Sequence, residues 1–202
     1  MTEQLSCVRG GRSLFRDLSF ELAAGEALVV TGPNGAGKTS LLRIIAGLLP
    51  PAAGRVALKG EVALGEACHF LSHHDGVKGA LTVMENLSFY CALLGGGDDG
   101  KEGAAPASAL SRLGLGALGD LPAYVLSAGQ KRRLALSKLL AAPRPIWLLD
   151  EPTAALDVTG KEVLLGMIGE HRARGGMAVV ATHLELELAD AREIFISNGR
   201  AA

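Results

Sequence analysis

One eight-residue stretch, GPNGAGKT at residues 32–39, constrains the fold of this chain more than any other. An apolar run, EALVV at residues 26–30, precedes it, and a helix-like segment, SLLRIIAGLL at residues 40–49, follows it. Glycines at these spacings let a loop turn its backbone N–H groups inward, toward the oxygens of a bound phosphate. A chance glycine-rich turn explains a full match in this context poorly, so the stretch predicts a phosphate-binding loop in an α/β domain.

Two side chains of this loop carry predicted chemistry. The Lys38 ammonium is expected to bind the β- and γ-phosphates, and the Thr39 hydroxyl to offer an oxygen to Mg²⁺. The other residues expected to surround the phosphates are Gly32, Pro33, Asn34, Gly35, Ala36, Gly37 and Ser40.

A second element, IWLLDE at residues 146–151, ends a buried apolar strand with two acids. Burying a carboxylate is costly unless it has a partner or a task, so both acids are expected to act at the strand end. Asp150 would hold Mg²⁺ through water, and Glu151 would polarise the attacking water as general base. His183 follows the strand MAVVAT and could hydrogen-bond a γ-phosphate, although a lone histidine is more often structural.

A third stretch, YVLSAGQKRRLAL at residues 124–136, combines a helical pattern of leucines with Ser127 as a predicted N-cap. The first turn of this helix holds Lys131, Arg132 and Arg133, although a helix N-terminus already carries partial positive charge. One interpretation is a solvated basic face. The other is a helix end that awaits an anion, such as a phosphate, from elsewhere.

The composition is that of an ordinary globular domain: 202 residues, 49% apolar, 20% charged, and a net charge of −1. This balance gives no support for a nucleic-acid partner. Charged residues and prolines interrupt the apolar runs at 41–50 and 134–149, so neither reaches the roughly 18–20 residues of a membrane span. Cys7, Cys68 and Cys91 are not arranged as CxxC and are expected to be reduced, mostly buried thiols of a cytosolic protein.

The rest of the chain alternates predicted strands and helices around the phosphate loop. Strands are expected at residues 5–9, 17–22, 26–30, 67–71, 145–152, 177–183 and 192–197, with one or two minor strands within 54–64. Helices are expected at residues 40–49, 81–94 with a Thr82–Glu85 capping box, 106–114, from Ser127 onward, and 161–175. Residues 95–103 are expected to be a flexible break. Residues 77–140 are expected to form a helical insert within a single domain, 1–202.

The motifs GPNGAGKT, LSAGQ, LLDEP and ALD, with a histidine at a strand end, occur in the order that resembles the ATP-binding cassette (ABC) ATPases. The resemblance covers nearly the whole chain, and LSAGQ sets it apart from other phosphate-loop proteins. It implies an α/β nucleotide-binding domain that binds ATP and Mg²⁺. This domain has a phosphate-loop core with a mainly parallel sheet, an N-terminal antiparallel β subdomain and an inserted α-helical subdomain.

The resemblance also implies a site that two chains share. In this family two cassettes pack head to tail, and the signature segment of each faces the ATP held by the other. The positions that match the signature are Ser127, Ala128, Gly129 and Gln130, with Ser127 and Gly129 as the expected contacts. Asp157 of the ALD motif is expected at the dimer seam.

Three positions depart from the family pattern. Ala128 stands where glycine is commonest, and a required positive φ there would be strained. His73, or His74 if the loop is one residue shorter, stands where the family has its switch glutamine. Arg9 stands where an aromatic side chain stacks on adenine; its guanidinium could stack on the base, or it could be a surface residue.

A transport ATPase is the function that this resemblance implies. A soluble cassette acting on ribosomes or DNA is the weaker alternative, because the chain has one cassette and no heptad run. A phosphate-loop kinase or GTPase is weaker still, because LSAGQ has no role there and NKxD is absent. Residues 70–90 and 124–140 look like the ATP-binding subunit of the haem exporter of cytochrome c biogenesis. ATPases of other small exporters, for lipoproteins or drugs, remain the alternative.

The expected partners follow from this resemblance. They are a second copy of the chain, separate transmembrane subunits and a haem-handling membrane protein, and the expected position is peripheral, on the cytoplasmic face of the bacterial inner membrane. ATP hydrolysis would power haem export or the release of haem from a carrier. Docking of the membrane subunits needs an apolar groove in the insert, for which Leu87, Phe89, Tyr90 and Leu94 are available; the alternative is that most of these side chains belong to the core.

Overall fold

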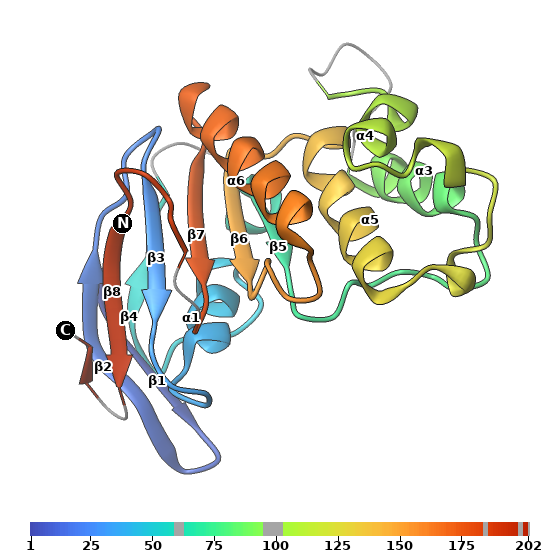
Figure 1. Ribbon diagram of the computed structural model, residues 1–202. Coiled ribbons are helices and arrows are strands. Elements are labelled where there is room, and N and C mark those ends of the chain that lie inside the picture. The colour runs from blue at the N-terminus through green and yellow to red at the C-terminus, as the bar shows by residue number, and fades with distance from the viewer. Residues whose placement is uncertain (59–62, 95–102, 184–185, 198–199, 202) are drawn as a thin grey trace. The chain divides into compact units, whose positions relative to one another are not determined.

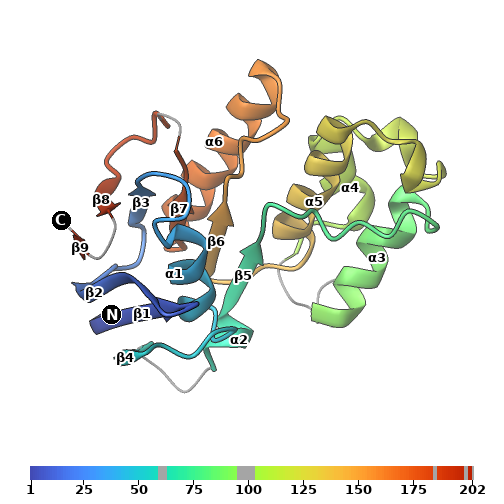
Figure 2. The ribbon, with the colours of Figure 1, turned by 90° about the horizontal axis from the view of Figure 1, so that it is seen from below.

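Two sheets build the first of the two units into which the chain divides. The computed structural model describes residues 1–58, 63–94, 103–183, 186–197 and 200–201. The first unit comprises Met1–Ser72, Arg144–Pro152 and Ile168–Ala202, and the second comprises His73–Pro143 and Thr153–Met167. Figure 1 and Figure 2 show the elements of both units, which are described one at a time below.

The larger sheet has the strand order β5-β6-β7-β3-β8-β9 (Figure 1). Its strands are β5 (Cys68–Leu71), β6 (Ile146–Asp150), β7 (Met177–Ala181), β3 (Ala27–Thr31), β8 (Arg192–Ser197) and β9 (Arg200–Ala201). The first five pair in parallel, and β9 pairs antiparallel with β8. Every residue of β6 is buried, as expected for a strand covered on both faces. The parallel arrangement brings the carboxyl ends of β3, β6 and β7 to one edge of the sheet.

The smaller sheet is antiparallel, with the order β2-β1-β4. Its strands are β1 (Thr2–Arg9), β2 (Arg12–Phe20) and β4 (Ala53–Val56). It lies on the same side of the parallel sheet as helix α1 (Lys38–Ile45), as Figure 2 shows. Leu5 and Phe15 of the small sheet, Leu41 of α1 and Leu148 of β6 are each fully buried in one apolar cluster. This cluster fixes α1 and the loop before it against the sheet.

Helices dominate the second unit. They are α3 (Val83–Leu94), α4 (Pro106–Arg112), α5 (Ala128–Ala141) and two 3₁₀ turns, Gly116–Leu118 and Ala123–Val125. The predicted helical insert, 77–140, lies within this unit. Helix α6 (Val158–Ala173) begins in the second unit and ends in the first. The Thr82–Glu85 capping box is confirmed: Thr82 N donates to Glu85 Oε2 at 2.8 Å, and Glu85 N donates to Thr82 Oγ1 at 3.1 Å.

The predicted α/β class and its two sheets are confirmed, as is one minor strand near residue 54, and the predicted start of the second strand is wrong. The second strand begins at Arg12 rather than at Asp17, because Gly10 and Gly11 both have positive φ and close a tight turn there. In the stretch 54–64, the described residues hold one strand, β4, and the short helix α2 (Leu64–Ala67) follows. Residues 59–62 and most of the predicted break, 95–102, lie outside the described residues.

Candidate active site

The phosphate loop joins β3 to α1 and ends on Gly37. This residue is the N-cap of α1, has a left-handed φ of 114°, and as a glycine has no side chain to accept a hydrogen bond from the first-turn N–H groups. A Cβ atom at this position would lie 3.0 Å from Leu14 Cβ and 3.1 Å from the Phe15 ring. Glycine is therefore required both by the backbone conformation and by the close approach to β2. The N–H groups of the first turn of α1 keep their partial positive charge for an anion.

Lys38 is turned onto the loop that precedes it. Its side chain is buried, and Nζ donates to Gly32 O at 2.6 Å and to Pro33 O at 3.2 Å. Both partners are neutral carbonyls of the phosphate loop. Phosphate oxygens, which are charged acceptors, would compete well for the same ammonium.

The two predicted magnesium ligands meet at the edge of the sheet. Thr39 Oγ1, in the first turn of α1, donates to Asp150 Oδ2 at 2.8 Å. Asp150 ends β6 and is buried, with 2% of its surface exposed. A hydroxyl and a carboxylate are the oxygen ligands that Mg²⁺ prefers, so the residues present fit this ion.

Glu151, the second acid of the pair, faces a different set of groups. Its carboxylate accepts from Thr182 Oγ1 at 3.1 Å and lies 2.8 Å from His183 Nδ1. An ionised carboxylate only accepts hydrogen bonds, so Nδ1 of His183 carries a proton in this contact. Glu151 has a φ of 47°, which is uncommon for a residue with a side chain, and its N–H donates to Ala181 O at 2.8 Å. The strained turn directs the two neighbouring acids toward different partners.

The signature segment begins helix α5 with a complete capping box. Gln130 N donates to Ser127 Oγ at 3.2 Å, and Ser127 N donates to Gln130 Oε1 at 2.9 Å. The predicted N-cap is therefore confirmed. Ala128 is the first helical residue, so the expected strain from a positive φ does not arise. The glycine that packing demands is Gly129, where an added Cβ would lie 2.9 Å from Ala155 O.

The cations after the signature are engaged within their own unit. Arg132 is 2% exposed and its Nη1 lies 2.9 Å from Asp75 Oδ1. Arg133 Nη2 lies 3.2 Å from Asp157 Oδ2. A solvated basic face is thus the wrong interpretation for Arg132. Asp157 Oδ1 also accepts from Gly160 N at 2.9 Å, at the start of α6, so this residue joins α5 to α6 within one chain.

Arg9 and His73 lie in exposed positions. Arg9 ends β1 opposite Arg12, two residues after Cys7. Burial raises the pKa of the Cys7 thiol, while a hydrogen bond with Ser40 and the Arg9 charge act in the opposite direction, so this end of β1 lies beside the start of α1. The rings of His73 and His74 are 4.0 Å apart, and both histidines remain candidates for the switch position.

The predicted docking groove is only partly exposed. Leu87 is fully buried, so it belongs to the core and not to the exposed part of this set. Tyr90 donates its hydroxyl hydrogen to Gly76 O at 2.6 Å, and Phe89 is 42% exposed. The other strongly exposed apolar side chains described in this unit are Leu93, Leu121, Tyr124, Val125 and Val158.

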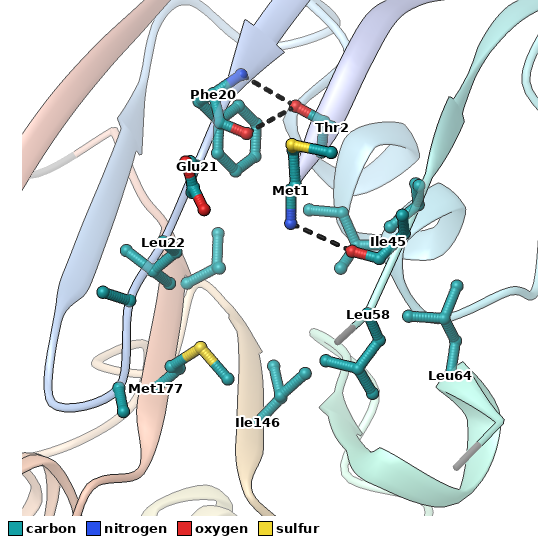
Figure 3. A pocket seen from close by; sticks show the side chains of 15 residues that line it. Met1, Thr2, Phe20, Glu21, Leu22, Ile45, Leu58, Leu64, Ile146 and Met177 are labelled. Atoms are coloured by element: carbon teal, nitrogen blue, oxygen red, sulfur yellow. Dashed lines mark hydrogen bonds between the residues drawn. The ribbon is translucent and has the colours of Figure 1, made fainter. Parts of the chain in front are cut away.

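An apolar cavity of about 330 Å³ lies near the amino ends of β6 and β7 in the first unit (Figure 3). Phe20, Ile45, Ile146 and Met177 are among its lining residues. Asp150 ends β6 at the opposite edge of the sheet. The cavity is therefore separate from the candidate active site.

The order of these groups along the chain can now be compared with known proteins. The sequence profile of the ABC transporter family matches residues 15–154, a span that includes the phosphate loop, the signature and both acids of β6. The chain belongs to the ABC transporter family. Two solved members share its fold. A putative ABC transporter ATP-binding protein from Pyrococcus furiosus has a TM-score of 0.82 and 25% identity over 96% of each chain. An ATP-binding subunit of an ABC transporter has a TM-score of 0.85 and 21% identity, covering 98% of this chain and 86% of its own.

Curated relatives within this family are more similar in sequence. The cytochrome c biogenesis ATP-binding export protein CcmA of Bradyrhizobium diazoefficiens is 53% identical over 193 residues, which cover 94% of each chain. The protein of the same name from Paramagnetospirillum magneticum is 51% identical over 201 residues, covering 96% of this chain and 92% of its own. Both alignments extend well beyond the motifs of the family.

None of the helices in the described part of the chain combines the length and the apolarity that crossing a bilayer requires.

Sequence reasoning missed one contact of a predicted site residue and two contacts within the second unit. Thr182 hydrogen-bonds Glu151, and its place beside His183 at a strand end was the available signal. Asp75 pairs with Arg132 across 57 residues of sequence, and Tyr90 binds the backbone of Gly76. No local sequence pattern predicts these last two contacts, because each depends on how distant segments pack.

Proposed function

We propose that this chain is the ATP-hydrolysing subunit of an ABC transporter complex that serves cytochrome c biogenesis, where it powers haem export or the release of haem from a chaperone. Membership of the ABC transporter family and 53% identity to a cytochrome c biogenesis export protein support the proposal. The observation that carries the ATPase role is the division of the two acids at the end of β6. Asp150 meets Thr39, whereas Glu151 meets Thr182 and His183.

In this proposal each group has a separate task. Lys38 leaves the loop carbonyls and binds the β- and γ-phosphates, while the N–H groups of α1 hold the remaining oxygens. Thr39 and Asp150 hold Mg²⁺, which neutralises charge on the β- and γ-phosphate oxygens. Glu151 accepts a proton from the attacking water, and Thr182 and His183 orient its carboxylate.

The proposed site is completed by a second copy of the chain. Ser127 and Gly129 of the partner copy would contact the γ-phosphate, with Ala128 and Gln130 forming the same helix end. Asp157 would lie at the seam between the copies. His73 would act as the switch that senses the γ-phosphate, and Arg9 would stack on adenine through its guanidinium plane.

The proposed partners outside the dimer are transmembrane subunits and a haem-handling membrane protein. The chain would then work at the cytoplasmic face of the bacterial inner membrane as a peripheral subunit. Phe89, the exposed member of the predicted docking set, is one candidate contact for those subunits.

The variant Glu151→Gln tests this proposal, because it removes the general base and keeps the shape of the side chain. Hydrolysis is expected to fall by about 10²–10⁴-fold while ATP binding persists. The same substitution in the chromosome should abolish maturation of c-type cytochromes. Turnover above roughly a tenth of the wild-type rate would contradict the role of Glu151. Normal c-type cytochromes in a deletion strain would contradict the biogenesis role and leave the ATPase role standing.

A further inference from the structure

Residues 75–81 connect the His73 region to helix α3 without forming a helix or strand of their own. Backbone N–H and C=O groups in such a segment need hydrogen-bond partners from elsewhere in the protein. Side chains of α3 and α5 supply several of these partners. The segment is therefore held at defined points by the helical unit.

Two buried cations of α5 meet at Asp75. Arg132 Nη1 lies 2.9 Å from the Asp75 carboxylate, and the side chain of Arg132 is 3% exposed. Lys138 Nζ donates to the backbone carbonyl of Asp75 at 2.9 Å, and Lys138 is 9% exposed. The two cations therefore hold both the side chain and the main chain of one residue.

Two side chains of α3 hold the next part of the segment. The Tyr90 hydroxyl donates to Gly76 O at 2.6 Å, and the ring of Tyr90 lies 3.6 Å from Lys138 Nζ. Asn86 is 1% exposed; its Oδ1 accepts from Lys78 N at 2.8 Å and its Nδ2 donates to Lys78 O at 2.9 Å. Gly76 has a φ of 62°, and an added Cβ would lie 3.1 Å from the Tyr90 oxygen. The fit around Gly76 leaves little room for the segment to shift.

The side chains that hold residues 75–81 indicate a role in positioning this segment more than a role in stabilising the fold. Desolvation offsets most of the attraction in a buried ion pair, so such a pair is weak evidence for a stabilising role. Hydrogen bonds, in contrast, require a defined geometry. Three of those that hold the segment are accepted by the backbone carbonyls of Asp75, Gly76 and Lys78. These bonds fix where the main chain runs, two residues after His73.

We propose that Arg132, Lys138 and Tyr90 form a clamp that positions His73 for the hydrolysis cycle. This proposal rests on the switch role of His73 given above. Because α5 also begins with the signature residue Ser127, the clamp makes the signature helix and the switch segment move together. Arg132, Lys138 and Tyr90 are positioning residues, since they act through the segment and not on the nucleotide.

Two mild variants test the clamp. Tyr90→Phe removes only the hydrogen bond to Gly76, and Asp75→Asn weakens the ion pair while it keeps the carbonyl that Lys138 binds. Each should lower kcat, by about tenfold for Asp75→Asn, with KM for ATP changed less than threefold, because misplacement affects the reacting geometry more than binding. The matched control is Arg55→Ala, which breaks the exposed ion pair with Glu3 in the first unit and should leave both constants unchanged.

A second readout separates positioning from mere loss of stability. The NMR signals of the His73 ring should move in Tyr90→Phe and Asp75→Asn, but not in Arg55→Ala. Adding Arg132→Gln to Asp75→Asn should lower kcat by less than the two single changes combined, because both changes affect the contact between Arg132 and Asp75. Variants that stay folded with kcat within twofold of wild type and with unmoved His73 signals would overturn the clamp. Full hydrolysis by His73→Ala would instead overturn the switch role, and the NMR comparison would still decide the clamp.

Discussion

Helices α1 and α5 begin in opposite ways, although both begin within a glycine-containing motif. Helix α1 has Gly37 as its N-cap, which has no side chain to cap the first turn. Helix α5 begins at Ser127, whose hydroxyl and backbone N–H are both occupied in a capping box with Gln130. The first helix end is open to an anion, and the second is already satisfied within the chain.

The cations near the two helix ends also differ in whether a carboxylate of the chain already neutralises them. Lys38 rests on two neutral carbonyls of the phosphate loop, which charged phosphate oxygens can replace. Arg132 and Arg133 instead pair with the carboxylates of Asp75 and Asp157. The α1 end thus leaves its cation available to a phosphate, whereas Arg132 and Arg133 near the α5 end are already paired within the chain. In the proposed function, the α5 end adds contacts to a nucleotide that a second copy holds.

The two capping boxes of the second unit allow the strongest test of whether Ser127 does more than cap helix α5. Ser127→Ala and Thr82→Ala each remove one N-cap hydroxyl, so each should lower the free energy of unfolding by about 1 kcal/mol. Only Ser127→Ala should also lower hydrolysis strongly, because only that hydroxyl is assigned to the γ-phosphate. Urea unfolding and ATPase assays well below the melting temperature measure the two effects. Equal activity in both variants would mean that Ser127 is only a cap.

A smaller effect concerns Lys138, the buried cation of α5 that no carboxylate side chain neutralises directly in the contacts described above. Burial lowers its pKa to about 8, and the Asp75 charge only partly opposes this shift. The folded state then binds fewer protons than the unfolded state between about pH 8 and 10.5, so the free energy of unfolding should rise with pH in this window. The rise from pH 7.5 to 9.5 should be on the order of 1 kcal/mol larger in wild type than in Lys138→Met. Equal slopes in urea unfolding would contradict the lowered pKa.

The sequence predicted that Thr39 and Asp150 of the first unit lie together, because each predicted group stands at the end of a regular element. Lys38 and Thr39 begin α1, and Asp150 ends β6, so a correct order of strands and helices already brings them to one edge. The length of the first hairpin was misjudged, since the turn depends on two glycines between polar residues. Ala128 would have been strained only if a positive φ were required there, and a helix start at this residue makes alanine suitable.

The second unit was less accessible to sequence reasoning. The helices α3 and α5 and their capping residues follow from local patterns. The partners of Arg132 and Arg133 do not, because Asp75 and Asp157 lie 57 and 24 residues away along the chain. Such pairings depend on tertiary packing, and helical periodicity cannot distinguish a buried arginine from a solvated one.

The most direct test of a site shared by two chains is a mixing experiment. Lys38→Ala should abolish ATP binding in its own chain, whereas Ser127→Arg should keep ATP binding and block hydrolysis in the partner chain, so each homodimer should be inactive. In a mixture, each heterodimer would hold one site with both defects and one with neither. We predict that ATPase activity of the mixture rises clearly above that of either variant alone. Activity no higher than that of the parents, in a mixture whose heterodimers are verified by crosslinking through Asp157→Cys, would contradict a shared site.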